Sequence, residues 1–96
     1  GVYLTAAVTV PMRPERRAEL PAVLTGADER PAPDVYVMHG RRTRTVVRPS
    51  GTEPKLKAYL EVVEPVSGPG ELAAVRAHAA ERLATLRAEV DALLAP

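Results

Sequence analysis

The chain has 96 residues, of which 46% are apolar and 26% charged, and its net charge is +1. These values are ordinary for a globular protein of this length, which allows one modest hydrophobic core. The sequence contains no cysteine, which excludes disulfides, thiolate catalysis and cysteine-based zinc sites. The first residues lack the basic region and the apolar core of a signal sequence, so we expect none, and the chain has no apolar run of about 18 residues. We therefore expect a single domain over residues 1–96, in the cytoplasm and without a membrane partner. Because the chain begins at Gly1, we expect it to be part of a longer polypeptide.

The first third of the chain predicts a strand, a short helix and a loop. Val2 to Val10 is rich in β-branched residues, which favours a strand. Arg13 to Leu24 predicts a helix that breaks at Pro21, because proline inside a helix removes a hydrogen bond. Ala27 to Pro33 contains an aspartate and two prolines, which predicts a loop.

The middle of the chain predicts a hairpin and a third strand. Val35 to His39 is expected to be a strand, Gly40 to Arg42 a turn, and Thr43 to Arg48 the returning strand. From Lys55 to Val63, apolar and polar residues alternate. The core face of that strand should carry Leu56, Ala58, Leu60 and Val62, and the other face Lys55, Lys57, Tyr59 and Glu61.

The last part predicts a linker over Pro65 to Gly70 and a long amphipathic helix over Glu71 to Leu94. Its apolar residues recur at steps of three and four: Leu72, Val75, Ala79, Leu83, Leu86, Val90 and Leu93. We expect this helix to cover a sheet; a coiled coil is the alternative. The order β-α-β-β-β-α predicts an α+β fold with a small, mostly antiparallel four-stranded sheet and helices packed on one face.

Positive charge is concentrated in one segment. Between His39 and Lys57, six basic residues stand against one acidic residue, whereas the remainder of the chain has an acidic balance of −4. A local positive field in a mildly acidic molecule favours an anionic ligand at that place. A solvated basic hairpin is the alternative interpretation.

The segment RPSGTEPKLK, residues 48–57, lies within this basic region and combines several groups that bind phosphate. Arg48 has a planar fork of donors that can meet two phosphate oxygens. Ser50 and Thr52 add hydroxyl groups, and Gly51 allows close backbone approach and a positive φ. Lys57 adds a second cation from the following strand. The segment predicts a phosphate site, with an ordinary charged turn as the alternative.

Other candidate groups are weaker. His39 and His78 could act as general bases, but no nucleophile is paired with them, so we predict no catalytic residue. The histidines and carboxylates lack metal-ligand spacing, so we predict no metal site. Glu53 should have a structural role, because a carboxylate facing the site would repel phosphate. Three tyrosines without Phe or Trp make no stacking platform, which argues against a nucleic-acid partner.

The sequence RPSGTEPKLKAYLE, residues 48–61, resembles the phosphate-binding loop of the α-D-phosphohexomutase superfamily, which includes phosphoglucomutase, phosphomannomutase and phosphoglucosamine mutase. Such enzymes end in a domain of this size, with a strand and a helix before the loop and a long helix after it. Carried over by position, the resemblance implies that the substrate phosphate is bound by Arg48, Ser50, Gly51, Thr52 and Lys57. The lysine pair followed by a tyrosine looks more like the phosphoglucomutase and phosphomannomutase branches.

The resemblance also implies what a parent enzyme would do. It would be an intramolecular phosphotransferase that interconverts a hexose 1-phosphate and a hexose 6-phosphate through a hexose 1,6-bisphosphate. Its phosphoserine and Mg²⁺ would be supplied by other domains, whose loops have no counterpart in this chain. We therefore expect the isolated domain to be inactive and to bind a phosphosugar together with the other domains. A stand-alone anion- or nucleic-acid-binding module is the alternative.

Overall fold

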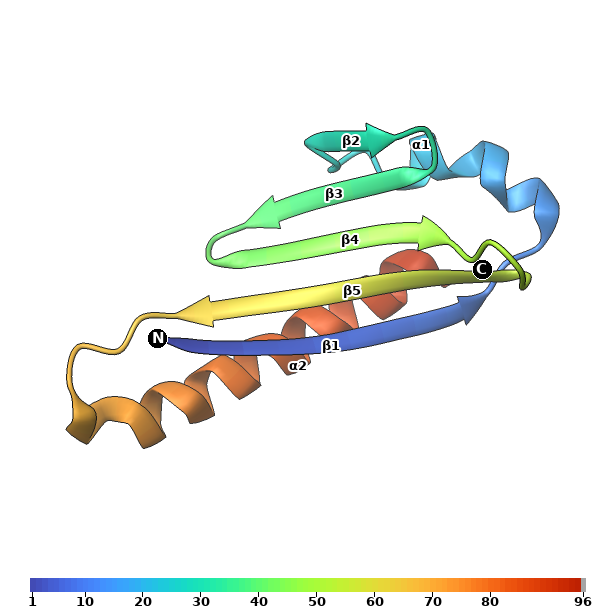
Figure 1. Cartoon of the computed structure of the whole chain (residues 1–96). Coiled ribbons are helices and arrows are strands. Elements are labelled where there is room, and N and C mark those ends of the chain that lie inside the picture. Colours follow the sequence, from blue (N-terminus) through green and yellow to red (C-terminus); the bar gives the residue numbers. More distant parts are fainter. Residues whose placement is uncertain (96) are drawn as a thin grey trace.

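A computed structural model describes residues 1–95. Five strands form one sheet in the order β1-β5-β4-β3-β2, and every neighbouring pair is antiparallel (Figure 1). The strands are β1 (Val2–Pro11), β2 (Glu29–Ala32), β3 (Val35–Gly40), β4 (Thr43–Pro49) and β5 (Lys55–Glu64). The α+β fold is confirmed, but the prediction of four strands is wrong by one.

The additional strand is β2, which lies where the sequence predicts a loop. Pro31 within it cannot donate a ladder hydrogen bond, and this feature favours a loop when the sequence is read alone. An edge strand, however, needs a partner on one side only. β2 pairs with β3 alone, and its register shifts between Glu29 and Ala32. The loop prediction therefore failed because the edge position tolerates proline.

The helical segments are η1 (Pro14–Glu19), α1 (Leu20–Val23), η2 (Pro69–Glu71) and α2 (Leu72–Leu94); both η segments are 3₁₀ helices. The helix predicted from Arg13 to Leu24, with a break at Pro21, is thus two short pieces. They meet between Glu19 and Leu20, so that Pro21 sits in the first turn of α1, where the missing N–H costs nothing. Over the described part of the chain, no helix is both long enough and apolar enough to cross a membrane.

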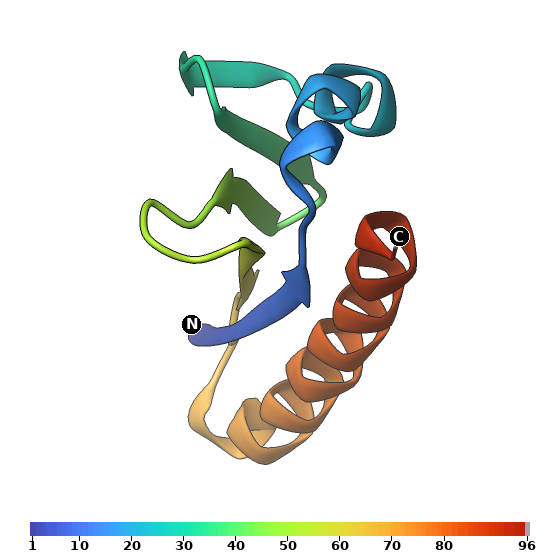
Figure 2. The same cartoon turned by 90° about the vertical axis from the view of Figure 1, so that its right-hand side faces the viewer.

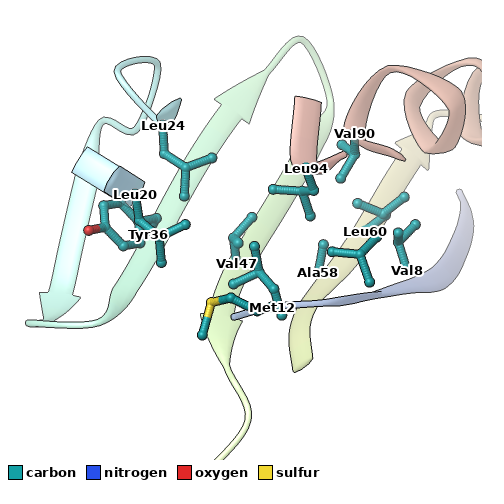
Figure 3. Close-up of a cluster of buried hydrophobic side chains, with 12 residues drawn as sticks. Val8, Met12, Leu20, Leu24, Tyr36, Val47, Ala58, Leu60, Val90 and Leu94 are labelled. Atoms are coloured by element: carbon teal, nitrogen blue, oxygen red, sulfur yellow. The ribbon is translucent and has the colours of Figure 1, made fainter. Parts of the chain in front are cut away.

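The helix α2 packs against β1 and β5 and leaves the opposite face of the sheet uncovered (Figure 2). The coiled-coil alternative is therefore wrong. The main cluster of buried side chains lies on the covered face and includes Leu20 and Leu24 from the α1 region (Figure 3). The predicted alternation in β5 is confirmed, because Leu56, Ala58, Leu60 and Val62 are all fully buried. Below, "the uncovered face" means the sheet face opposite α2.

The buried stripe of α2 differs from the prediction at both ends. Ala79 and Val90 are buried as expected, but Leu72 and Leu93 are 43% and 40% exposed. Leu94 is fully buried instead of Leu93. Consecutive helical residues point about 100° apart, so only one of the two can face the core. Near the C-terminal end of α2 the core includes Leu20 and Leu24 of the α1 region. The helix contacts this part of the core through Leu94 rather than through Leu93.

A buried carboxylate joins the end of β5 to α2 and to the β3–β4 turn. Glu64 is only 5% exposed. It accepts hydrogen bonds from Arg82 of α2 and from Arg42, whose Nη1 lies 3.4 Å from Oε2. Arg82 also donates to the backbone oxygen of Arg41 at 2.6 Å. The hydrogen bond from Arg82 is the main reason that the pKa of Glu64 lies below its ordinary value.

We expect Glu64 to make folding sensitive to acid. Its pKa is lower in the folded chain than in the unfolded chain, so its stabilisation is complete above the ordinary glutamate pKa of about 4.3. It is lost as pH falls through the folded-state pKa. Glu64→Gln should lower the melting temperature at neutral pH and flatten its decline in acid. Thermal unfolding followed by circular dichroism from neutral to acidic pH measures both effects.

The control is Glu61→Gln, which removes the same charge from β5 at a half-buried position. This variant should keep the acid dependence of the wild type. An acid dependence in Glu64→Gln as steep as in the wild type would contradict the role of the carboxylate.

Candidate phosphate-binding site

The predicted phosphate segment lies at one end of the sheet, where β4 connects to β5 (Figure 1). Residues 50–54 form the connecting loop. The backbone N–H of Ser50 donates to the oxygen of Lys55 at 2.8 Å, and the N–H of Lys55 donates to the oxygen of Glu53 at 2.8 Å. These bonds close the base of the loop, so its conformation is defined by the two strands that it joins.

The side chain of Ser50 organises the loop from within. Its Oγ accepts long hydrogen bonds from the backbone N–H groups of Thr52, at 3.4 Å, and Glu53, at 3.3 Å. A serine hydroxyl that bonds backbone two or three residues on is a common turn device. Because the oxygen acts here only as an acceptor, the hydroxyl hydrogen is still able to donate to an anion.

Gly51 does not use the left-handed backbone conformation that glycine permits; within residues 1–95, positive φ occurs only at Arg42. A Cβ built on Gly51 would meet no atom within 4 Å. The loop would therefore accommodate a side chain here. What the glycine provides is open space above the backbone, through which a ligand can approach.

The two cations of the predicted site lie side by side. Arg48 of β4 and Lys57 of β5 are register partners. Both point to the uncovered face, because their chain neighbours Val47 and Ala58 are buried on the α2 side. Arg48 is exposed and Lys57 half-buried. In the part of the chain that the structure describes, neither side chain forms an ion pair.

Glu53, the single acidic residue of the segment from residue 48 to residue 57, forms an ion pair that balances its charge. Its Oε2 lies 3.3 Å from Nζ of Lys55. The pair agrees with the structural role expected for this carboxylate. Consequently, the positive charges of Arg48 and Lys57 are not offset within the loop.

Sequence reasoning missed two contacts around the loop. The guanidinium of Arg48 lies over the ring of Tyr59, 5.6 Å from its centroid. This contact could have been inferred from the alternation in β5, which placed Tyr59 on the same face as Lys57. The second contact joins the N–H of Met12 to the oxygen of Pro54 at 2.7 Å. A hollow of about 400 Å³ beside this contact is lined by Pro11, Met12, Arg13, Pro14, Arg16 and Pro54.

The two histidines do not lie at this site. His39 is near the end of β3 that is remote from the loop, and its Nδ1 lies 2.9 Å from Oδ1 of Asp28. This hydrogen bond lowers the pKa of Asp28. His78 is on α2, beside Arg82. Among residues 1–95, no group of three or more potential metal-ligating side chains is found.

Comparison with known protein families identifies the class of domain. The family described as "Phosphoglucomutase/phosphomannomutase, C-terminal domain" matches residues 7–78, about three quarters of the chain, including the loop between β4 and β5. No curated protein and no solved structure matches significantly. The extent of the family match is sufficient: the chain belongs to the family of phosphoglucomutase/phosphomannomutase C-terminal domains.

Proposed function

We propose that the chain is the substrate-phosphate-binding domain of a phosphosugar mutase. Membership of the family supports the enzyme class. The observation that carries the phosphate-binding role is the adjacent pair Arg48 and Lys57, which lies beside a hydroxyl-bearing loop and forms no ion pair within residues 1–95. We therefore assign phosphate contacts to Arg48, Ser50, Gly51, Thr52 and Lys57.

The charges and donors of this loop suit a phosphate ester. A phosphate monoester carries a charge of nearly −2 at neutral pH, which two cations can balance. The fork of Arg48 can hold two oxygens, and the hydroxyls of Ser50 and Thr52 can reach others. The open space above Gly51 leaves room for the ester oxygen and the sugar. In this proposal these groups position the phosphate and do not react with it.

Binding a phosphate that is not being transferred would contribute to catalysis by orientation. A parent mutase would interconvert hexose 1-phosphate and hexose 6-phosphate through a bisphosphorylated sugar. Interactions with a remote phosphate hold the reacting phosphate in register and reduce the entropic barrier. Because either phosphate of the intermediate must occupy this site in turn, the site should recognise phosphate rather than the sugar. The phosphoserine and Mg²⁺ would come from the other domains of the parent.

The test is a titration of the chain with inorganic phosphate and with glucose 1,6-bisphosphate, followed by amide chemical shifts in NMR. Weak, saturable shifts are expected, centred on residues 48–57. Arg48→Ala should weaken the affinity about tenfold or more, as expected for loss of charge-assisted hydrogen bonds.

The matched control is Arg44→Ala, which removes the same charge from the same strand and the same face. Arg44 is paired with Glu61, with Nη1 and Oε1 3.7 Å apart, so its loss should leave phosphate affinity nearly unchanged. Equal responses of the two variants would refute a specific site. Tight oligonucleotide binding with a steep salt dependence would favour a nucleic-acid-binding module instead.

A further inference from the structure

The cations of the uncovered face fall into two groups. Arg44 is paired with Glu61, and Lys55 with Glu53. Arg48 and Lys57 form no ion pair within the described chain. An arginine without a partner carboxylate is expected to sample many rotamers, since its side chain has about 2 kcal/mol of conformational entropy. Arg48 therefore needs another contact to hold it in one place.

Tyr59 makes that contact. It is the register partner of Val46, while Lys57 is the partner of Arg48, so Arg48 and Tyr59 are diagonal neighbours on one face. Such neighbours are within reach of each other when one side chain is aromatic and the other long. The guanidinium carbon lies 5.6 Å from the ring centroid, inside the range of a cation–π interaction.

This contact differs chemically from an ion pair. A carboxylate would occupy the N–H donors of the guanidinium and cancel its charge. An aromatic ring attracts the cation through its π-electron density, so the donors in the guanidinium plane remain able to bind an anion. Stacking thus restrains the side chain without using the groups that a phosphate requires.

We infer that Tyr59 is a positioning residue for Arg48: its ring holds the guanidinium over the uncovered face, ready for phosphate. This inference rests on the proposed function and deepens it. Tyr59 itself makes no phosphate contact in this proposal. It acts by reducing the entropy that Arg48 loses when phosphate binds.

The alternative is that Tyr59 only covers apolar surface of the sheet. Tyr59 lies between Ala7 and Val46, its register partners on the two neighbouring strands. A packing role predicts an effect on stability but none on phosphate affinity. The two roles are therefore separable by measuring both quantities in the same variants.

The experiment compares Tyr59→Leu and Tyr59→Phe by phosphate titration and thermal unfolding. Leucine retains apolar volume but removes the π system, whereas phenylalanine retains the ring and removes only the hydroxyl. Tyr59→Leu should weaken phosphate binding about two- to fivefold, the size of an exposed cation–π interaction. Tyr59→Phe should bind like the wild type. Tyr3→Leu is the matched control, because Tyr3 lies on the same face, 58% exposed and far along β1 from Arg48.

A spectroscopic signature and a double variant complete the test. The Nε–H resonance of Arg48 should carry a ring-current shift in the wild type and in Tyr59→Phe that is lost in Tyr59→Leu. In the Arg48→Ala background, Tyr59→Leu should not weaken phosphate binding further. Equal affinities of wild type and Tyr59→Leu, with Arg48→Ala still impaired, would overturn the role of Tyr59 and leave the proposed function standing. Equal affinities of wild type and Arg48→Ala would overturn both.

Discussion

Replacing Arg48 with alanine in a mutase that contains this domain is expected to lower kcat/KM about 30- to 1,000-fold, which corresponds to about 2–4 kcal/mol. Within residues 1–95 the guanidinium forms no ion pair; it lies beside Lys57 and can donate two charge-assisted hydrogen bonds to one phosphate. Removing it also leaves the dianion with only one balancing cation. The loss should be shared between a higher KM and a lower kcat, because remote binding both retains and orients the substrate.

Steady-state kinetics of two further variants provide values of kcat/KM with which the loss in Arg48→Ala can be compared. Ser50→Ala should cost less, about 1 kcal/mol, since it removes one hydrogen bond from an uncharged donor and two long contacts within the loop. Arg44→Ala removes the same charge as Arg48→Ala, four residues earlier on the same face. It should leave kcat/KM close to the wild-type value. Unaltered kinetics in Arg48→Ala would exclude this side chain from the phosphate site.

The second large effect is expected on stability, at the C-terminal end of α2. Leu94→Ala should lower the free energy of unfolding by about 2–5 kcal/mol, because Leu94 is fully buried in the main core cluster and its removal leaves a cavity. Leu93→Ala should change it by less than about 1 kcal/mol. Leu93 is 40% exposed, and alanine favours a helix slightly more than leucine does.

Urea unfolding of the two variants measures this difference directly. The substitutions are chemically identical and adjacent in sequence, so each is the control for the other. Equal losses of stability would mean that fraying of the last helical turn removes the contact of Leu94. A larger loss of stability for Leu93→Ala would mean that Leu93 is the buried residue, as the periodicity of the sequence predicts.

Much of the fold follows from patterns that repeat over short distances. The alternation in β5 predicted both its buried residues and the face on which Lys57 and Tyr59 lie, because successive strand residues point to opposite sides. The hairpin from Val35 to Arg48 was predicted from a turn between two strand-like segments, and the long C-terminal helix from apolar residues at steps of three and four. The five residues of the candidate site could be proposed from sequence, since all of them lie within ten consecutive positions, and their role as phosphate contacts stays a prediction.

Contacts between distant segments were not predictable in this way. β2 exists because β3 offers a free edge to a proline-containing segment, a condition that the segment itself does not encode. The ion pair between Glu64 and Arg82 joins residues on β5 and α2. The sequence around either residue does not indicate that the other is its partner.

By itself, the sequence determined which residues form the strands β1, β3, β4 and β5, the helix α2 and the loop between β4 and β5, because propensity, periodicity and turn chemistry act between near neighbours. Only the tertiary structure decided that Leu94 rather than Leu93 is buried, that β2 completes the sheet, and that Arg48 rests on Tyr59. Each of these depends on which surfaces meet after the chain has folded, and local patterns carry no information about the partner surface.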